Sequence, residues 1–350
     1  MSSAVPGRLR DFFSSRTGFA VAVVACAAIV AAGFALKARN SDHTAVAEPP
    51  TTTSATAPAE SIRGVLLGAS TSPEVRGLQV DQAEKSAVQA LEQRIGRTLD
   101  IDHNFYTWDD PFPTDVERWD LQSGRIPMIS WNGRGVTTAE IAAGRRDDLI
   151  RQRAKAVKAL GKPLFIRWFW EMDGNQKAQY AGTPAEYIAA WRHIVTIFRN
   201  QGADNVRWVW CPNAWAFNDG SAQQFYPGDD FVDWTCADGY NWAPGRPRDQ
   251  YRSFMDIFQG FYGWASLKNK PIMVGEFGVQ ERNPGDKAQW ITDTREAIKK
   301  DFPLMRAVVY FDNNKDYDWR LTTSDSALEA LRQMADDPWF NLGANRRVLN

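Results

Sequence analysis

Two glutamates stand out because each follows a short apolar run, at a point where a strand would end. Glu171 closes the run 164–170, and Glu276 follows 272–275 with Gly275 on one side and Gly278 close on the other. A carboxyl group buried beside indoles loses hydration, so its pKa is expected to rise. A neutral carboxylic acid near pH 7 can donate a proton to a leaving oxygen. Glu171 therefore fits a general acid, and Glu276 fits a second, ionised carboxylate.

Each glutamate also has a purely structural explanation. Arg167 shares its strand parity with Glu171, so the two could form an ion pair, or Arg167 could hold a substrate hydroxyl. Gly-Glu-Phe-Gly could be an ordinary turn. The joint occurrence is more informative, because glutamates that end strands four and seven of one barrel face each other across its mouth. They could then approach the roughly 5–5.5 Å separation of a retaining glycosidase pair.

Such a barrel is expected from the alternation of strand-like and helix-like segments. Eight apolar runs suit buried parallel strands: 65–70, 99–105, 126–131, 164–170, 206–211, 234–240, 272–275 and 307–311. Segments of helical period lie between them: 81–94, 139–160, 184–199, 251–268, 287–300 and 324–335. Residues 214–232 look loop-like, and no Gly-x-Gly-x-x-Gly turn supports nucleotide binding. Strict alternation with eight repeats predicts an α/β fold, a (β/α)8 TIM barrel over residues 61–350.

At these motifs the sequence resembles glycoside hydrolase family 26, over nearly all of the region from Gly64 onward. The most specific stretches are 167–175, 226–234 running into 238–242, and 275–278. The resemblance implies that Glu171 is the acid/base, Glu276 the nucleophile, and Tyr240 a hydrogen-bond donor to the nucleophile. Tyr240 could alternatively be a barrel-core residue.

One departure from the family bears on specificity. The family usually has His immediately before the acid/base, often in a His-Glu-Met-Asn run, whereas this chain has Trp170 followed by Glu171, Met172 and Asp173. A histidine can donate to a sugar hydroxyl, whereas an indole mainly stacks. The subsite beside the cleaved bond should therefore differ, which weakens the case for mannan, the family's commonest substrate.

Other residues at strand ends complete a candidate substrate cleft. Trp131 and Trp242 are the favoured sugar-stacking residues because they stand beside Gly or Pro in expected top loops. Core packing is an equally good reading of either ring. His103 and Asn213 are further candidates, and His103 could simply be a satisfied hydrogen-bonding residue. Tyr106, Trp215 and Asp312 also follow strands, each with a weak individual signal.

The N-terminus predicts export. Residues 17–36 form 20 uncharged, mostly apolar positions, preceded by Arg8, Arg10 and Arg16. That length and charge bias predict a transmembrane signal anchor, with residues 1–16 in the cytoplasm. A signal peptide cleaved near 45–47, or a lipoprotein signal ending at Cys26, are the alternatives. Residues 37–60, rich in Ser, Thr, Pro and Ala, are expected to form a tether. The barrel would then lie outside the cell membrane, or be secreted after cleavage.

Composition narrows the partners. Lys plus Arg number 41 and Asp plus Glu 42, so no basic surface for nucleic acid is expected. No His/Cys cluster has metal-ligand spacing, and no cofactor is implied. Cys211 and Cys236 could pair in an oxidising compartment or stay as buried thiols. We expect a monomer.

These observations predict an endo-acting hydrolase that cleaves a β-mannan or a β-1,4 or mixed-linkage glucan by double displacement. The endo assignment rests on the resemblance. Two alternatives remain open: a catalytically silent carbohydrate-binding barrel at the membrane surface, and a transglycosylase that passes the glycosyl group to a sugar.

Overall fold

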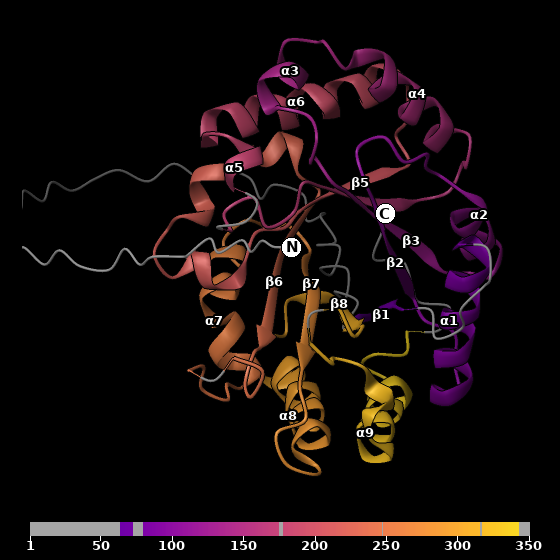
Figure 1. Ribbon diagram of the computed structural model, residues 1–350, viewed down its shortest axis with the longest axis vertical. Coiled ribbons are helices and arrows are strands. Elements are labelled where there is room, and N and C mark those ends of the chain that lie inside the picture. The colour runs from indigo at the N-terminus through magenta and orange to yellow at the C-terminus, as the bar shows by residue number, and fades with distance from the viewer. Residues whose placement is uncertain (1–63, 73–79, 175–177, 247, 316, 343–350) are drawn as a thin grey trace, which may run out of the picture. The chain divides into compact units, whose positions relative to one another are not determined.

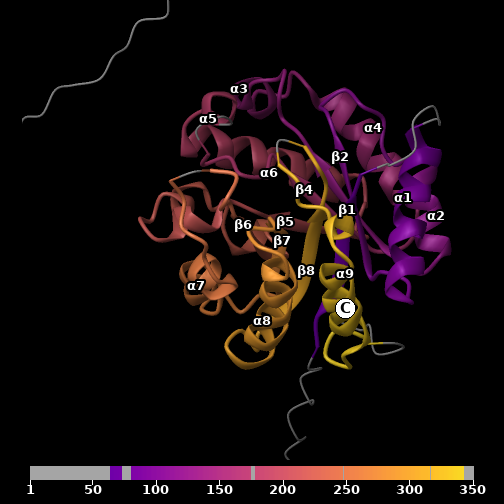
Figure 2. The same ribbon diagram turned by 60° about the horizontal axis from the view of Figure 1, so that its bottom comes forward.

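The computed structural model describes residues 64–72, 80–174, 178–246, 248–315 and 317–342. Its strands form a closed barrel in the order β1 to β8, and every neighbouring pair is parallel. Helices surround the strands in both views (Figures 1 and 2). The expected (β/α)8 barrel is confirmed.

The eight strands coincide with the eight expected runs. Their bounds are β1 Leu66–Thr71, β2 Ile101–Tyr106, β3 Ile126–Trp131, β4 Leu164–Trp168, β5 Val206–Trp210, β6 Trp234–Asn241, β7 Ile272–Val279 and β8 Met305–Asp312. Strand β7 continues past Glu276, which the sequence placed after the strand's end. The longer strand fixes the backbone of Glu276 by pairing on both sides of it.

The described α-helices are α1 Val80–Ile95, α2 Asp115–Gln122, α3 Thr138–Ala142, α4 Asp147–Lys158, α5 Ala178–Ala181, α6 Pro184–Asn200, α7 Phe254–Ala265, α8 Asp286–Lys300 and α9 Asp325–Asp336. Between β5 and β6 lie three short 3-10 helices, η1 Ala214–Phe217, η2 Ala222–Phe225 and η3 Asp229–Phe231, so the loop-like reading of 214–232 is confirmed. A fourth, η4 Leu321–Thr323, precedes α9.

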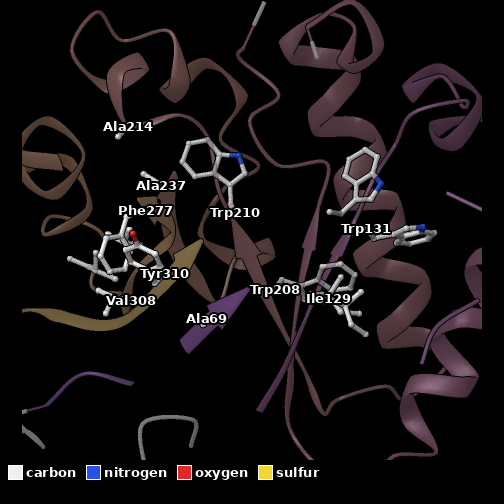
Figure 3. Packing of buried hydrophobic residues seen from close by; sticks show 14 of the residues in the cluster. Ala69, Ile129, Trp131, Trp208, Trp210, Ala214, Ala237, Phe277, Val308 and Tyr310 are labelled. Carbon is white, nitrogen blue, oxygen red and sulfur yellow. The ribbon is translucent and has the colours of Figure 1, made fainter. Parts of the chain in front are cut away.

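Two apolar layers support the barrel. One fills its interior with side chains such as Leu66, Phe165 and Met273. The other lies between the outer face of the strands and the helices, and Figure 3 shows part of it, including Trp208 and Trp210. Because alternate residues of a strand point to opposite faces, both layers are drawn from the same strands.

Two helical predictions were wrong. The segment 139–160 is not one helix, because Gly144 adopts φ 76° and separates α3 from α4. A left-handed residue cannot continue a right-handed helix, and glycine adopts that conformation at little cost. Helix α2 was not predicted. Its signal in the sequence was a capping box at its start. The Glu117 carboxylate accepts from Thr114 N–H at 2.6 Å, and the Thr114 hydroxyl accepts from Val116 N–H at 3.1 Å.

The predicted membrane segment lies outside the described residues. Within the part of the chain that the structure describes, no helix is both long and apolar enough to cross a bilayer.

Candidate active site

Glu276 reaches the barrel interior through an irregularity in β7. The pairing of β7 with β8 shifts register between Val274 and Phe277, and the pairing of β6 with β7 shifts between Ala237 and Asp238. Such bulges re-aim a side chain without breaking the sheet. Only glycine fits at Gly275, because a Cβ there would lie 2.6 Å from the Cys236 sulfur and 2.9 Å from Asp238.

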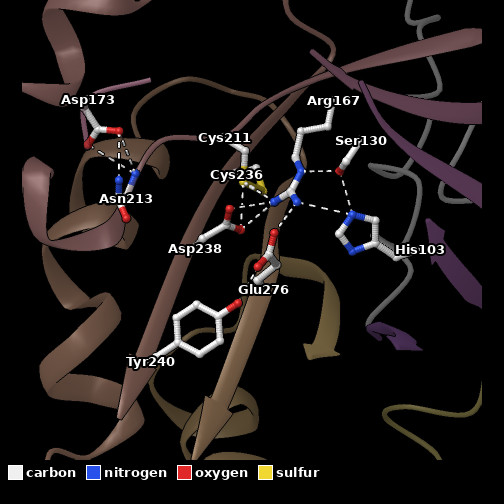
Figure 4. A network of polar contacts seen from close by, with 10 residues as sticks. All are labelled: His103, Ser130, Arg167, Asp173, Cys211, Asn213, Cys236, Asp238, Tyr240 and Glu276. Atoms are coloured by element: carbon white, nitrogen blue, oxygen red, sulfur yellow. Dashed lines mark hydrogen bonds and ion pairs between the residues drawn. A yellow bond between two sulfur atoms is a disulfide. The ribbon is translucent and has the colours of Figure 1, made fainter. Parts of the chain in front are cut away.

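Two donors converge on the carboxylate of Glu276. Arg167 of β4 forms an ion pair with Oε1, and the Tyr240 hydroxyl of β6 donates to Oε2 (Figure 4). Glu276 is only 5% exposed, so both contacts are largely shielded from water. The predicted bond from Tyr240 to Glu276 is therefore present, and the two donors fix which way the carboxylate faces.

Arg167 is the centre of this network and is fully buried. Its Nη1 lies 2.7 and 2.6 Å from the two carboxylate oxygens of Asp238, and its Nε donates to the Ser130 hydroxyl at 2.8 Å. Burial alone would lower the pKa of Arg167, but Asp238 and Glu276 outweigh it and raise that pKa. The guanidinium therefore stays charged and forms ion pairs with Asp238 and Glu276. The purely structural explanation in the sequence analysis had offered only Glu171 as the partner of Arg167.

Tyr240 is a dependable donor. Burial, and then the negative charge of Glu276, raise the pKa of its phenol well above the ordinary value. Its ring is held by Trp319, with centroids 4.8 Å apart, and by Phe311 at 5.8 Å. The hydroxyl therefore stays protonated and in place at any working pH.

Glu171 lies in the loop immediately after β4, half-buried, on a strained backbone. Phe169 and Glu171 adopt φ 45° and 53°, in the left-handed region that costs a non-glycine residue about 1–3 kcal/mol. Three hydrogen bonds stabilise this conformation. Glu171 N–H donates to the Cys211 carbonyl at 2.8 Å, Gly174 N–H to the Glu171 carbonyl at 3.0 Å, and Asn213 N–H to Asp173 at 3.1 Å. Strain held in this way is common where a side chain must be aimed for function.

Asn213 acts on this loop and not on Glu276. Its amide Nδ2 also donates to Asp173 at 3.2 Å, so it fastens the acid/base segment to the end of β5. Burial, opposed by these hydrogen bonds, raises the pKa of Asp173 to about 6. The predicted role of Asn213 in contacting substrate stays a prediction.

His103 belongs to the layer beneath the cleft. Its Nε2 lies 2.6 Å from the Ser130 hydroxyl and 3.2 Å from Nη2 of Arg167, and the residue is 1% exposed. Burial, and then the charge of Arg167, hold the pKa of His103 well below its usual range. His103 therefore contacts Arg167 and Ser130 through Nε2, while its buried Nδ1 has no hydrogen-bond partner, so the reading as a satisfied hydrogen-bonding residue holds for one ring nitrogen only.

Aromatic rings form the walls above this network. Trp170 packs against Phe105 with centroids 5.3 Å apart and covers Arg167 at 5.0 Å, and Phe105 remains 39% exposed. On the other side Trp242, half-buried, lies 5.0 Å from the Tyr240 ring and 5.2 Å from Trp319. Trp170 thus packs against Arg167 and Trp242 against Tyr240, and the predicted contact of either ring with a sugar stays a prediction.

The predicted sugar-stacking role of Trp131 does not fit the structure. Its ring is fully buried, stacks on Trp108 with centroids 4.4 Å apart, and donates from Nε1 to the Trp108 carbonyl at 3.2 Å. It points outward from β3 into the layer beneath the helices, because it lies an odd number of residues, three, from the inward-facing Met128. Trp131 therefore packs the core and is closed to a sugar.

Sequence reasoning missed three residues of the site: Asp238, Phe105 and Trp319. Asp238 could have been found, since it lies two residues before Tyr240 on the same face of a strand, and a buried arginine is usually paired with a carboxylate. Phe105 and Trp319 carried no comparable signal, because an aromatic residue in a strand or loop is usually part of a core.

The two cysteines are joined. A disulfide links Cys211 and Cys236, with Cα atoms 4.3 Å apart, and the Cys211 sulfur lies 3.2 Å from Oδ1 of Asp238 and 3.6 Å from Nη1 of Arg167. The thiol alternative is not what the structure shows. Among the described residues, Cys211, Cys236 and Asp238 are the one group close enough to suggest a metal site. The disulfide takes both thiolates out of that group.

Known proteins resemble this chain over most of its described length. The family model for glycosyl hydrolase family 26 matches residues 147–270. Endoglucanase H of Acetivibrio thermocellus is 37% identical over 262 residues, which are 72% of this chain and 29% of that protein. A β-1,3-xylanase of a Vibrio species is 28% identical over 170 residues, 47% of this chain and 33% of that protein. The chain thus spans about a third or less of the length of these relatives.

Solved structures show the same fold. A family 26 β-mannanase from Bacteroides ovatus aligns with TM-score 0.60 and 13% identity, covering 79% of this chain and 90% of that one. The catalytic domain of an endo-β-1,4-mannanase from Bacillus sp. JAMB-750 aligns with TM-score 0.61 and 17% identity, covering 79% and 87%. With the barrel, the two glutamates and these likenesses in place, the chain belongs to glycosyl hydrolase family 26.

Proposed function

We propose that this protein is a retaining, endo-acting glycoside hydrolase that cleaves a β-linked polysaccharide. The observation that carries the proposal is the buried Glu276, held by Arg167 and Tyr240 inside a barrel whose fourth strand leads directly into Glu171. A carboxylate fixed by two donors is suited to attack a carbon, and a half-buried carboxyl on the opposite side of the mouth is suited to move a proton.

The reaction has two steps. In the first, a Glu276 oxygen bonds to the anomeric carbon while the glycosidic C–O bond breaks, and Glu171 gives its proton to the leaving oxygen. In the second, Glu171 removes a proton from water, whose oxygen displaces Glu276 from the sugar. The anomeric centre is inverted twice, so its configuration is retained.

Among β-glycans, we favour glucan with β-1,4 or mixed linkages, with β-mannan as the other candidate. Trp170 stands where the family usually has a histidine. Its indole is packed against Phe105 and Arg167 and is only 8% exposed, so this position lacks the imidazole of a histidine, and the 39% exposed Phe105 is the apolar ring beside it that a sugar could contact. The 37% identity with a protein named endoglucanase H supports the same choice.

We further propose that the enzyme works outside the cytoplasm as a monomer, tethered by residues 17–36 and the segment 37–60. Support comes from the uncharged, apolar stretch after Arg16 and from the disulfide between Cys211 and Cys236, which suits an oxidising compartment.

The test is reducing-end release by the purified chain from β-mannan, mixed-linkage glucan, cellulose derivatives and xylan, with Glu276→Ala as control. Release from one glycan that disappears in the control supports the proposal. Binding of a glycan without release would favour the silent barrel, and products longer than the substrate would reveal transglycosylation.

A further inference from the structure

Trp215 is exposed in a way that no other tryptophan of the chain is. Its side chain is 47% exposed, whereas the other tryptophans, all of them within the described residues, are buried or half-buried. The residues around it in η1, Ala214, Ala216 and Phe217, are buried, so this short helix turns one indole alone outward. An indole left in water contributes little to the stability of the fold, so its position calls for another explanation.

Trp215 stands at the rim of the barrel that carries the acid/base. Helix η1 follows the C-terminal end of β5, next to β4 in the barrel. The residues just before it grip the Glu171 loop, since the Cys211 carbonyl accepts from Glu171 N–H at 2.8 Å and Asn213 N–H donates to Asp173 at 3.1 Å. Trp215 is two residues beyond Asn213, so the indole and the acid/base share one rigid rim.

The proposed reaction indicates which part of the substrate would contact this rim. The leaving oxygen must lie within hydrogen-bond distance of Glu171 to receive its proton, whereas Glu276 attacks from β7, two strands beyond β5. The sugar attached to the leaving oxygen therefore passes over the β4–β5 side. A pyranose presents C–H groups on its face, and an exposed indole is a flat apolar surface for them.

We propose that Trp215 is a platform for the leaving-group side of the polysaccharide and sets the preference for long chains over short substrates. This inference rests on the proposed hydrolase function and assigns Trp215 to the same cleft as Glu171. The proposal also implies that, if a sugar replaces water as the acceptor in the second step, this sugar would stack on Trp215.

The test compares two substrates that share the same glycone. One is the polysaccharide that the wild-type chain cleaves best, and the other is an aryl oligosaccharide whose leaving group is a nitrophenol without a sugar. In Trp215→Ala we expect kcat/KM for the polysaccharide to fall about fivefold to tenfold further than kcat/KM for the aryl substrate, the scale of one aromatic contact. Trp215→Phe, which keeps a flat ring, should recover most of the ratio.

Leu267→Ala is the matched control, because Leu267 is 83% exposed and lies beyond α7, away from the rim. It should leave the ratio of the two kcat/KM values at the wild-type value, and thermal melting should confirm that all three variants fold. An equal loss on both substrates in Trp215→Ala, or no loss on either, would overturn this inference while the hydrolase stands. A wild-type chain that cleaves no glycan would instead overturn the proposed function and this inference with it.

Discussion

At the scale of single residues, the site depends on one buried arginine that serves two carboxylates. Arg167 pairs with Asp238 through both oxygens and with Glu276 through one. Removing Arg167 would leave both buried carboxylates without a compensating charge, and breaking a buried ion pair in this way typically costs about 3–5 kcal/mol. The network is therefore a positioning device whose parts cannot be exchanged one at a time.

Tyr240→Phe tests the second donor to Glu276. The change keeps the ring contacts with Trp319 and Phe311 but removes the hydroxyl, so we expect kcat to fall by roughly 10²-fold, as when one preorganised donor is lost. The melting temperature should change little. Trp242→Phe provides a control that alters the neighbouring ring only. A loss of less than twofold in Tyr240→Phe would show that this hydrogen bond does not contribute to catalysis.

Glu171→Ala tests the acid/base through the leaving group. The first step on an unactivated polysaccharide needs a proton, so its rate should fall about 10²–10⁴-fold. A dinitrophenyl glycoside leaves without a proton, so its glycosylation rate should fall far less, and added azide should accelerate turnover by replacing activated water. Equal losses on both substrates would contradict the acid/base role. Asp204→Asn, which changes an exposed carboxylate before the start of β5, is the control.

Sequence alone singled out Glu171, Glu276 and Tyr240 because motif and strand end coincide at each, and their catalytic roles stay predictions. It could not fix what each touches. The partner of Arg167 depends on register shifts in β6 and β7 that place Asp238 and Glu276 on the inside together. Trp131 was misplaced for a related reason, since the face of a strand to which a large aromatic turns is decided by parity within the closed barrel.

At the scale of elements, a buried acidic cluster joins α1, β2 and α2. It contains Glu84, Asp102, Glu117 and Asp120, and Arg125 reaches Asp120 at 3.5 Å. One oxygen of Asp102 and one of Asp120 have no hydrogen-bond partner. Burial is the main reason that the pKa of Asp102 rises to about 6 and that of Glu84 to about 7, and the pKa of Asp120 is raised as well.

This cluster predicts a pH dependence of stability. The ordinary pKa of Asp102 is 3.8, so between pH 4 and 6 the folded chain holds a proton that the unfolded chain has lost. Folding is therefore favoured at low pH, and this contribution is lost as pH rises through about 6. In Asp102→Asn the amide can donate toward Asp120 and still accept from Asn104. The loss of stability that Asp102 causes as pH rises should therefore be absent from this variant.

We expect Asp102→Asn to gain about 1–3 kcal/mol of unfolding free energy, relative to wild type, on going from pH 4 to pH 8, a shift of a few degrees in melting temperature. Thermal melting across this range measures it. Asp115→Asn, which removes an exposed carboxylate from α2, the helix that carries Asp120, should show no such trend. A difference between Asp102→Asn and wild type that is constant with pH would contradict the raised pKa of Asp102 in the folded chain.

Elements with strong periodicity were predictable, including all eight strands and α1, α6, α8 and α9. The break at Gly144 was not, because a glycine inside a helical pattern is usually tolerated and only the left-handed φ reveals an end. The acidic cluster was also out of reach, since Asp102 and Asp120 are brought together by packing and not by spacing in the sequence.

At the scale of the whole molecule, closure of the barrel makes the site. The strands that carry Arg167, Asp238, Tyr240 and Glu276 are separated along the chain by helices, and only the parallel order β4 to β7 gathers their ends at one mouth. Eight repeats in the sequence were enough to predict that closure. The end of the membrane anchor at residue 36 and the end of the tether at residue 60 stay predictions.

Residues 61–350 are expected to carry the whole activity. Expressed without residues 1–36, the chain should be recovered in the soluble fraction, with kcat/KM within about twofold of the detergent-solubilised full chain, since the site residues found among the described residues all lie beyond residue 61. Cell fractionation of the full chain should place it with membranes. A full chain that stays soluble and keeps its N-terminal residues would argue against the anchor.

The most direct test of the central claim is covalent trapping of the nucleophile. The wild-type chain is incubated with a 2-deoxy-2-fluoro glycoside of the accepted sugar that bears a dinitrophenyl leaving group, and its peptides are analysed by mass spectrometry. The account predicts one fluorosugar per chain, attached to Glu276, with loss of activity in proportion to labelling. A label on another residue, or none on a chain that cleaves the matching glycan, would contradict it.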